Sequence, residues 1–183
     1  MRIIESSKSP NNSVMTKKLF IIWIVTIIPF IIFLALYSTN PSSPLLLSLS
    51  EMTKGLKVLH SANNPLLSTI MSAWCKTAPL WGVIVFLFSF SHIEIRGERS
   101  PGQIVKGVLL FSVLYFPIMI ILLLNSAEMT ESGRLYKLMS QGDYLLTTLF
   151  IAIYTFCYVA TTYYLVMLFA AFKSFKSKRI IPM

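Results

Sequence analysis

The chain has 183 residues, of which 55% are hydrophobic and 13% charged, and its mean hydropathy is +0.71. A water-soluble domain of this length carries about 25% charged residues, so the composition excludes a single soluble core. The net charge of +9 raises the question of nucleic acid, but the basic residues lie in short clusters beside apolar runs, where they orient a chain in a membrane. We therefore expect a lipid bilayer and no nucleic acid as a partner.

The first apolar run follows a polar, basic amino-terminal segment, residues 1–18. It covers residues 19–37 without a charge, and a helix of that length spans roughly 28 Å, close to the hydrocarbon thickness of a bilayer. A cleavable signal peptide is the alternative, but its apolar region would be shorter and followed by a cleavage site of small residues. The sequence after Tyr37 is a poor cleavage site. The run predicts a first transmembrane helix at 19–37.

A long connection, residues 38–76, comes next. Within it, Asn64 and Pro65 have the pattern of an N-cap followed by a proline at the first helical position. Apolar residues between 66 and 75 recur at the helical period on one face, and Ser68 and Ser72 lie on the other. This pattern predicts an amphipathic helix at 65–76 that leads into the second span, with Trp74 and Lys76 at the membrane interface.

The rest of the chain alternates between apolar runs and polar segments. We predict a second span at 77–93, a charged turn at 94–106, a third span at 107–124, a polar connection at 125–143, a fourth span at 144–172 and a basic tail at 173–183. The expected fold is an all-α membrane protein with four transmembrane helices and an interfacial amphipathic helix before the second span.

The distribution of basic residues predicts the orientation. Eleven of the 16 Lys and Arg residues lie in the two terminal segments and the 94–106 turn, and five lie in the connections 38–76 and 125–143. Because cytoplasmic segments carry the excess of Lys and Arg, both termini are expected in the cytoplasm and both longer connections outside. An odd number of spans would separate the two basic ends, which the same rule disfavours.

Chemistry-bearing motifs are missing. The four predicted spans contain no Asp, Glu, Lys or Arg, which argues against a pump, a proton-coupled transporter or a voltage sensor. The sequence has no HExxH, GxSxG or phosphate-binding loop. His92 beside Glu94 is an acid–base pair or, as we prefer, an interfacial polar residue, and Cys75 and Cys157 form no CxxC motif. We expect no enzyme, no metal and no cofactor.

Uncharged hydroxyl groups are concentrated in the fourth span. Tyr154, Tyr158, Thr161 and Thr162 belong to this group, and hydroxyls in hydrocarbon bond to their own helix or to a neighbouring helix. They form either a recognition face for a membrane-embedded partner or packing contacts among the chain's own helices. No GxxxG motif distinguishes these interpretations.

Two segments carry a resemblance to a known family. NPLLSTIM at 64–71, leading to CKTAP at 75–79, resembles the stretch before the second span in immunity proteins to pore-forming colicins of the colicin A and B type. EMTESGR at 128–134, followed by Leu138 and Met139, resembles the second outer loop of that family. The similarity covers roughly residues 60–180 and extends to the basic tail.

The resemblance implies a toxin-neutralising protein of the bacterial inner membrane. Such a protein binds the pore-forming domain of its cognate colicin, chiefly the hydrophobic helical hairpin, and prevents channel opening. On this hypothesis, toxin recognition is expected at the predicted helix 65–76 and in the fourth span, through Trp74, Lys76, Thr77, Tyr154, Tyr158, Thr161 and Thr162. The alternative function is that of a small membrane transporter or channel accessory subunit.

Overall fold

The computed structural model describes residues 10–92 and 101–178, and within these ranges it is helical. The described residues contain seven α-helices, and a short 3-10 helix, Phe90–His92, follows the fourth. Their bounds are α1 Pro10–Thr39, α2 Pro44–Met52, α3 Pro65–Cys75, α4 Ala78–Ser89, α5 Pro101–Leu124, α6 Arg134–Met139 and α7 Asp143–Lys178. Glu94, and with it the less favoured alternative of a His92–Glu94 pair, lies outside the described residues.

Four helical segments in the described part of the chain are long and apolar enough to cross a membrane. They cover residues 14–39, 65–89, 102–124 and 143–174. This confirms the expected all-α membrane protein with four candidate spans. The second segment includes both α3 and α4, which are separated only by Lys76 and Thr77. The bounds of the spans within a bilayer remain predictions.

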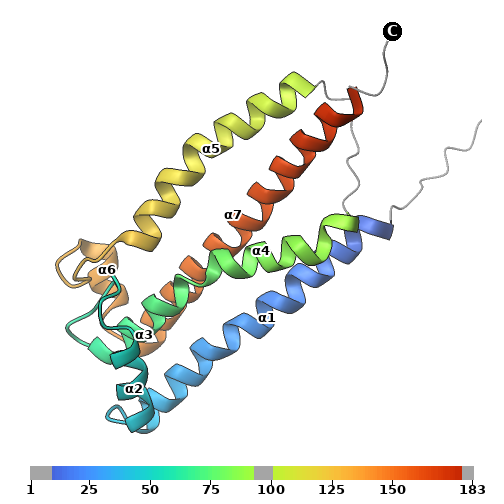
Figure 1. Cartoon of the computed structure of the whole chain (residues 1–183). Coiled ribbons are helices and arrows are strands. Elements are labelled where there is room, and N and C mark those ends of the chain that lie inside the picture. The colour runs from blue at the N-terminus through green and yellow to red at the C-terminus, as the bar shows by residue number, and fades with distance from the viewer. Residues whose placement is uncertain (1–9, 93–100, 179–183) are drawn as a thin grey trace, which may run out of the picture.

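The long helix α7 is the centre of the bundle. It packs against α4, α5, α3 and α1, and half of its most apolar segment is buried, against 11% of the corresponding segments in α1 and α5. Helix α5 stands apart from α1 and α4 and follows α7 along its length (Figure 1). One face of α7 therefore stays open.

The connections gather at one end of the bundle. Helices α2 and α6, the start of α3 and the start of α7 lie together there, and the start of α1 and the end of α7 lie at the opposite end (Figure 1). We call the surface formed by residues 44–64 and 125–142 the loop platform. It joins the two connections that the charge distribution predicts to lie on the outer, periplasmic side of the membrane.

Helix α2 is the main element that the sequence did not predict. It begins at Pro44, which follows Ser43 as Pro65 follows Asn64 in α3, so the same proline signal is present at both starts. Leu46 is fully buried and anchors α2 against the rest of the protein, where its neighbours are α3 and α1.

Candidate functional site

The two connections of the loop platform meet through their backbones. His60 N–H donates to the Ala127 carbonyl at 3.3 Å, and Met129 N–H donates to the His60 carbonyl at 2.8 Å. These bonds form a single parallel bridge between His60 and Glu128. Segments far apart in the sequence are thus held as one surface.

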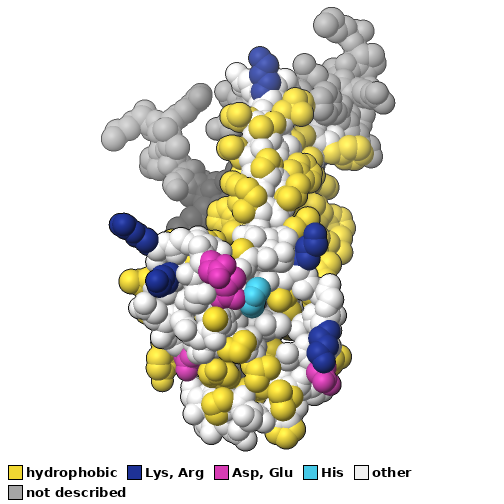
Figure 2. Space-filling view, turned by 90° about the vertical axis from the view of Figure 1, so that its left-hand side faces the viewer, with side chains coloured by type: hydrophobic (Ala, Val, Ile, Leu, Met, Phe, Trp, Pro, Cys, Tyr) yellow, Lys and Arg dark blue, Asp and Glu magenta, His cyan; other side chains and the backbone are white. Residues whose placement is uncertain are grey.

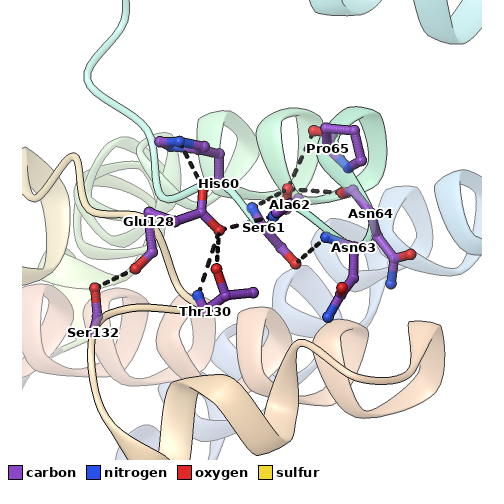
Figure 3. A network of polar contacts seen from close by, with 10 residues as sticks. His60, Ser61, Ala62, Asn63, Asn64, Pro65, Glu128, Thr130 and Ser132 are labelled. Atoms are coloured by element: carbon purple, nitrogen blue, oxygen red, sulfur yellow. Dashed lines mark hydrogen bonds and ion pairs between the residues drawn. The ribbon is translucent and has the colours of Figure 1, made fainter.

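The Glu128 carboxylate strengthens this junction (Figure 3). Its Oε2 lies 2.8 Å from His60 Nε2, and its Oε1 accepts hydrogen bonds from Ala62 N–H and the Thr130 hydroxyl, both at 2.8 Å. Partial burial alone would raise the pKa of Glu128, but the bonds from Thr130 and Ala62 and the charge of His60 outweigh it and lower the pKa. The ionised carboxylate is therefore the form that holds the platform together.

Two buried serine hydroxyls attach the platform to α3. Leu59 N–H donates to Ser72 Oγ and Ser61 N–H donates to Ser68 Oγ, each at 2.9 Å. Ser68 is fully buried and Ser72 nearly so, so the polar face of α3 meets the preceding connection and not water. Each hydroxyl satisfies a backbone donor that would otherwise be left without an acceptor.

A third attachment reaches the segment between α6 and α7. Asn63 Nδ2 donates to the Ser140 carbonyl at 3.1 Å. Glu131, Arg134 and Lys137 are exposed in the second connection, and Figure 2 shows basic and acidic side chains spread over the loop end. The platform is a mixed-charge surface on a hydrogen-bonded framework.

An apolar pocket of about 230 Å³ opens beside the platform, between α1, α2 and α3. Two of the predicted recognition residues, Trp74 and Thr77, belong to its wall. The complete lining is Phe33, Leu49, Met52, Thr53, Leu56, Ile70, Ala73, Trp74 and Thr77.

Trp74, Lys76 and Thr77 are half-buried and bonded within the chain. Trp74 Nε1 donates to the Thr26 carbonyl of α1 at 3.1 Å, and the Lys76 ammonium donates to the Leu123 carbonyl in the last turn of α5. Thr77 Oγ1 donates to the Trp74 carbonyl at 2.8 Å. Trp74 and Lys76 thus tie the segment around the end of α3 to α1 and α5, while Thr77 is bonded locally. A role of the three residues in toxin recognition stays a prediction.

The four predicted recognition residues of α7 lie inside the bundle. Tyr154, Tyr158 and Thr162 are fully buried, and Thr161 is 4% exposed. Tyr158 donates to the Leu19 carbonyl at 2.8 Å, and Thr161 Oγ1 lies 3.0 Å from the Tyr115 hydroxyl. The structure brings these residues together, but in contacts with α1, α4 and α5. Of the two interpretations of the hydroxyl groups, their burial favours internal packing.

The open face of α7 was not identified from the sequence. With Phe111 of α5 it forms an apolar groove of about 680 Å³. The groove is lined by Phe111, Ala152, Thr155, Phe156, Val159, Ala160 and Tyr163. A helical wheel separates these α7 residues from Tyr154 and Tyr158, but only the positions of α1, α4 and α5 decide which face is covered.

The described residues contain no group of three or more His, Cys, Asp or Glu side chains placed to hold a metal ion. The candidate functional site is therefore a pair of surfaces, the loop platform with its pocket and the groove along α7.

The chain is similar to known proteins over most of its length. The family model described as colicin immunity protein matches residues 42–179. The colicin-A immunity protein of Citrobacter freundii is 26% identical over 175 residues, 96% of this chain and 98% of that protein. The colicin-B immunity protein of Escherichia coli is 29% identical over 174 residues, 95% of this chain and 99% of that protein.

A shorter similarity links the chain to the colicin-N immunity protein of Escherichia coli, at 33% identity over 79 residues, 43% of this chain and 60% of that protein. No solved structure matches the chain. The family model alone covers well over half of the sequence and confirms the resemblance carried by residues 64–79 and 128–139. The chain belongs to the colicin immunity protein family.

Proposed function

We propose that this protein protects the cell that makes it against a pore-forming colicin. It binds the pore-forming domain of its cognate toxin, chiefly the hydrophobic hairpin, in the inner membrane and keeps the channel closed. The observation that carries the proposal is that the family-like segment 128–139 is joined to the connection just before the family-like segment 64–79. Glu128 forms a bridge with His60 in that connection, and the neighbouring Leu59 and Ser61 are bonded to Ser72 and Ser68 of α3. In this arrangement both termini lie in the cytoplasm and the platform faces the side from which the toxin arrives.

Physical reasoning supports an antidote without catalytic groups. A pore-former acts only after it enters the bilayer, so its antidote needs surfaces that meet helices in lipid and at the interface. The groove along α7 offers such a surface, because Ala152 and Ala160 in its wall let another helix approach closely. The platform and the pocket beside Trp74 offer contacts at the interface. Complementary packing and polar contacts would determine which toxin is bound.

The alternative function, a transporter or channel subunit, gains nothing from the described residues. Thr161 and Thr162 are bonded within the bundle and do not line a polar path. The groove along α7 and the pocket beside Trp74 have mainly apolar walls, which do not solvate an ion or a polar solute.

The proposed function is tested in toxin-sensitive bacterial cells. Cells that express the protein are exposed to a panel of pore-forming colicins, and potassium efflux and survival are measured; nuclease colicins serve as the control. We expect protection against one pore-forming type and none against the nucleases. Protection against no pore-forming colicin would contradict the proposal, provided that the protein is present in the membrane fraction.

A second experiment locates the contacts. Ala152→Leu with Ala160→Leu fills the groove on α7, and Leu109→Phe changes an exposed side chain on α5 as the matched control. We expect the groove variant to lose protection at unchanged protein level and the control to keep it. Exchanging the platform with that of a differently specific relative tests the second surface, and unchanged toxin specificity would exclude the platform.

A further inference from the structure

We propose that α2 is an interfacial helix whose membrane-facing stripe, Leu45, Met52 and Leu56, contacts phospholipid acyl chains. This inference goes beyond the proposed function and does not depend on colicin binding. It assigns a lipid surface as the partner of an element that the sequence analysis did not predict.

The position of α2 follows from its connection to α1. The first candidate span ends at Thr39 and α2 begins at Pro44. The four residues between them form a tight turn, in which Ser43 N–H donates to the Asn40 carbonyl and Ser42 N–H donates to Asn40 Oδ1, both at 3.1 Å. This turn keeps the start of α2 next to the end of α1, at the level where the apolar run gives way to polar residues.

The side chains of α2 divide into distinct faces. Leu46 is buried against the protein, while Leu45 and Met52 are 52% and 79% exposed. Positions 45 and 52 are seven residues apart and lie on the same side of a helix. Leu56, 50% exposed, follows just beyond the end of the helix. Glu51 lies on another side of α2, where it pairs with the exposed Lys54 at 3.3 Å.

The pocket beside α2 shows in which direction the apolar stripe faces. Met52 and Leu56 share the pocket with Phe33 of α1 and with Trp74 and Thr77. Phe33 lies six residues before the end of α1, inside the apolar run, so this side of α2 faces back along the bundle toward the hydrocarbon.

The loop end shows the same segregation of side chains. Hydrophobic side chains gather over its lower part, where α2 lies, and a charged pair borders them (Figure 2). A helix with an apolar face and a charged face is the form that lies in the plane of a membrane interface. Phospholipid is thus the occupant that fits both the position and the direction of the stripe.

Spin labelling of the full chain tests this assignment. Single cysteines replace Leu45 and Met52 on the stripe, and Leu47→Cys and Glu51→Cys provide controls on the opposite side. Each variant is labelled with a nitroxide in vesicles of phosphatidylethanolamine and phosphatidylglycerol. Collision rates with oxygen, which concentrates in lipid, and with a water-soluble nickel chelate are measured by electron paramagnetic resonance. The parent chain is the labelling control, because Cys75 and Cys157 are buried.

We expect oxygen collisions to exceed nickel collisions at positions 45 and 52, and the reverse at positions 47 and 51. Because Leu47 is itself apolar, this contrast reports the direction of each face and not residue type. Nickel collisions in excess at all four positions, or no contrast between the two faces, would overturn the proposal. Dipolar broadening between the labels of two chains, which indicates a second copy on this face, would also overturn the proposal. A stripe that loses its collisions with the nickel chelate only after a colicin pore-forming domain is added would overturn it as well. A variant that misfolds at one stripe position is replaced by Leu56→Cys.

Discussion

The close contact of α4 with α7 at Gly82 predicts different effects for two glycine-to-alanine substitutions. A Cβ at Gly82 would lie 3.0 Å from the Thr161 Cβ and 3.0 Å from the Tyr158 carbonyl oxygen. Neither atom can rotate away, so the two helices would have to separate by several tenths of an ångström. Overpacking of this kind lowers the free energy of unfolding by about 1–3 kcal/mol. Replacing glycine by alanine in a helix raises it by about 0.5–1 kcal/mol. We expect Gly82→Ala to lower the free energy of unfolding by about 1–2 kcal/mol.

The matched control is Gly107→Ala in α5, where a Cβ would meet no atom within 4 Å. This variant should be as stable as the parent or slightly more stable, because it keeps only the gain in helix propensity.

Both variants can be measured by thermal unfolding in detergent micelles with a thiol-reactive fluorescent dye. Cys75 and Cys157 are buried at 3% and 0% exposure, so the dye reacts when the bundle opens. We expect Gly82→Ala to lower Tm by roughly 2–8 °C, using the size scaling of globular domains. If Gly82→Ala unfolds at the same temperature as the parent, the inferred close packing of α4 and α7 is refuted.

Three further predictions concern single polar groups. Because hydrogen bonds lower the pKa of Glu128, the stabilisation by its carboxylate is present above the ordinary carboxylate pKa of about 4 and is lost as the pH falls through the lower folded-state pKa. The protease resistance of the loop platform should therefore weaken more in acid for the parent than for Glu128→Gln. Equal pH dependence of the two proteins would contradict this. Ser72→Ala leaves the Leu59 N–H without its acceptor and should cost about 1–3 kcal/mol in the dye assay, whereas the exposed Ser48→Ala should cost nothing measurable; equal effects would argue against the bond. Tyr158→Phe removes the bond to the Leu19 carbonyl and should cost about 0.5–1.5 kcal/mol, while Tyr163→Phe at an exposed position serves as control, and a cost as large there would refute the assignment.

The number of spans could be predicted because a bilayer restricts what can cross it. Long uncharged runs must be helical in hydrocarbon, since every backbone donor and acceptor has to be satisfied within the segment. The start of α3 at Pro65 was also predictable, because Asn64 and Pro65 give a local signal. Helix α2 has only nine residues, and short helices depend on tertiary packing more than on propensity.

The surfaces of the site were harder to predict because they depend on which helices are neighbours. The contact between His60 and Glu128 joins two connections that have no local relation in the sequence. Periodicity correctly placed Ser68 and Ser72 on one face of α3, but it could not show that the preceding connection covers this face. On α7, periodicity grouped the hydroxyls, and the positions of α1, α4 and α5 determined that Tyr154 and Tyr158 point inward.

The framework beneath the loop platform bears on how the proposed toxin would be recognised. Glu128 fixes the two connections to each other, and Ser68, Ser72 and Asn63 fix them to α3 and to the segment before α7. A surface that is already ordered loses little conformational entropy when a partner binds, so more of the contact energy appears as affinity. If so, Glu128→Ala should weaken protection mainly by loosening the platform, and toxin binding should restore part of the lost protease resistance of the variant. A variant that loses protection while its platform stays as protease-resistant as the parent's would instead mean that Glu128 contacts the toxin directly.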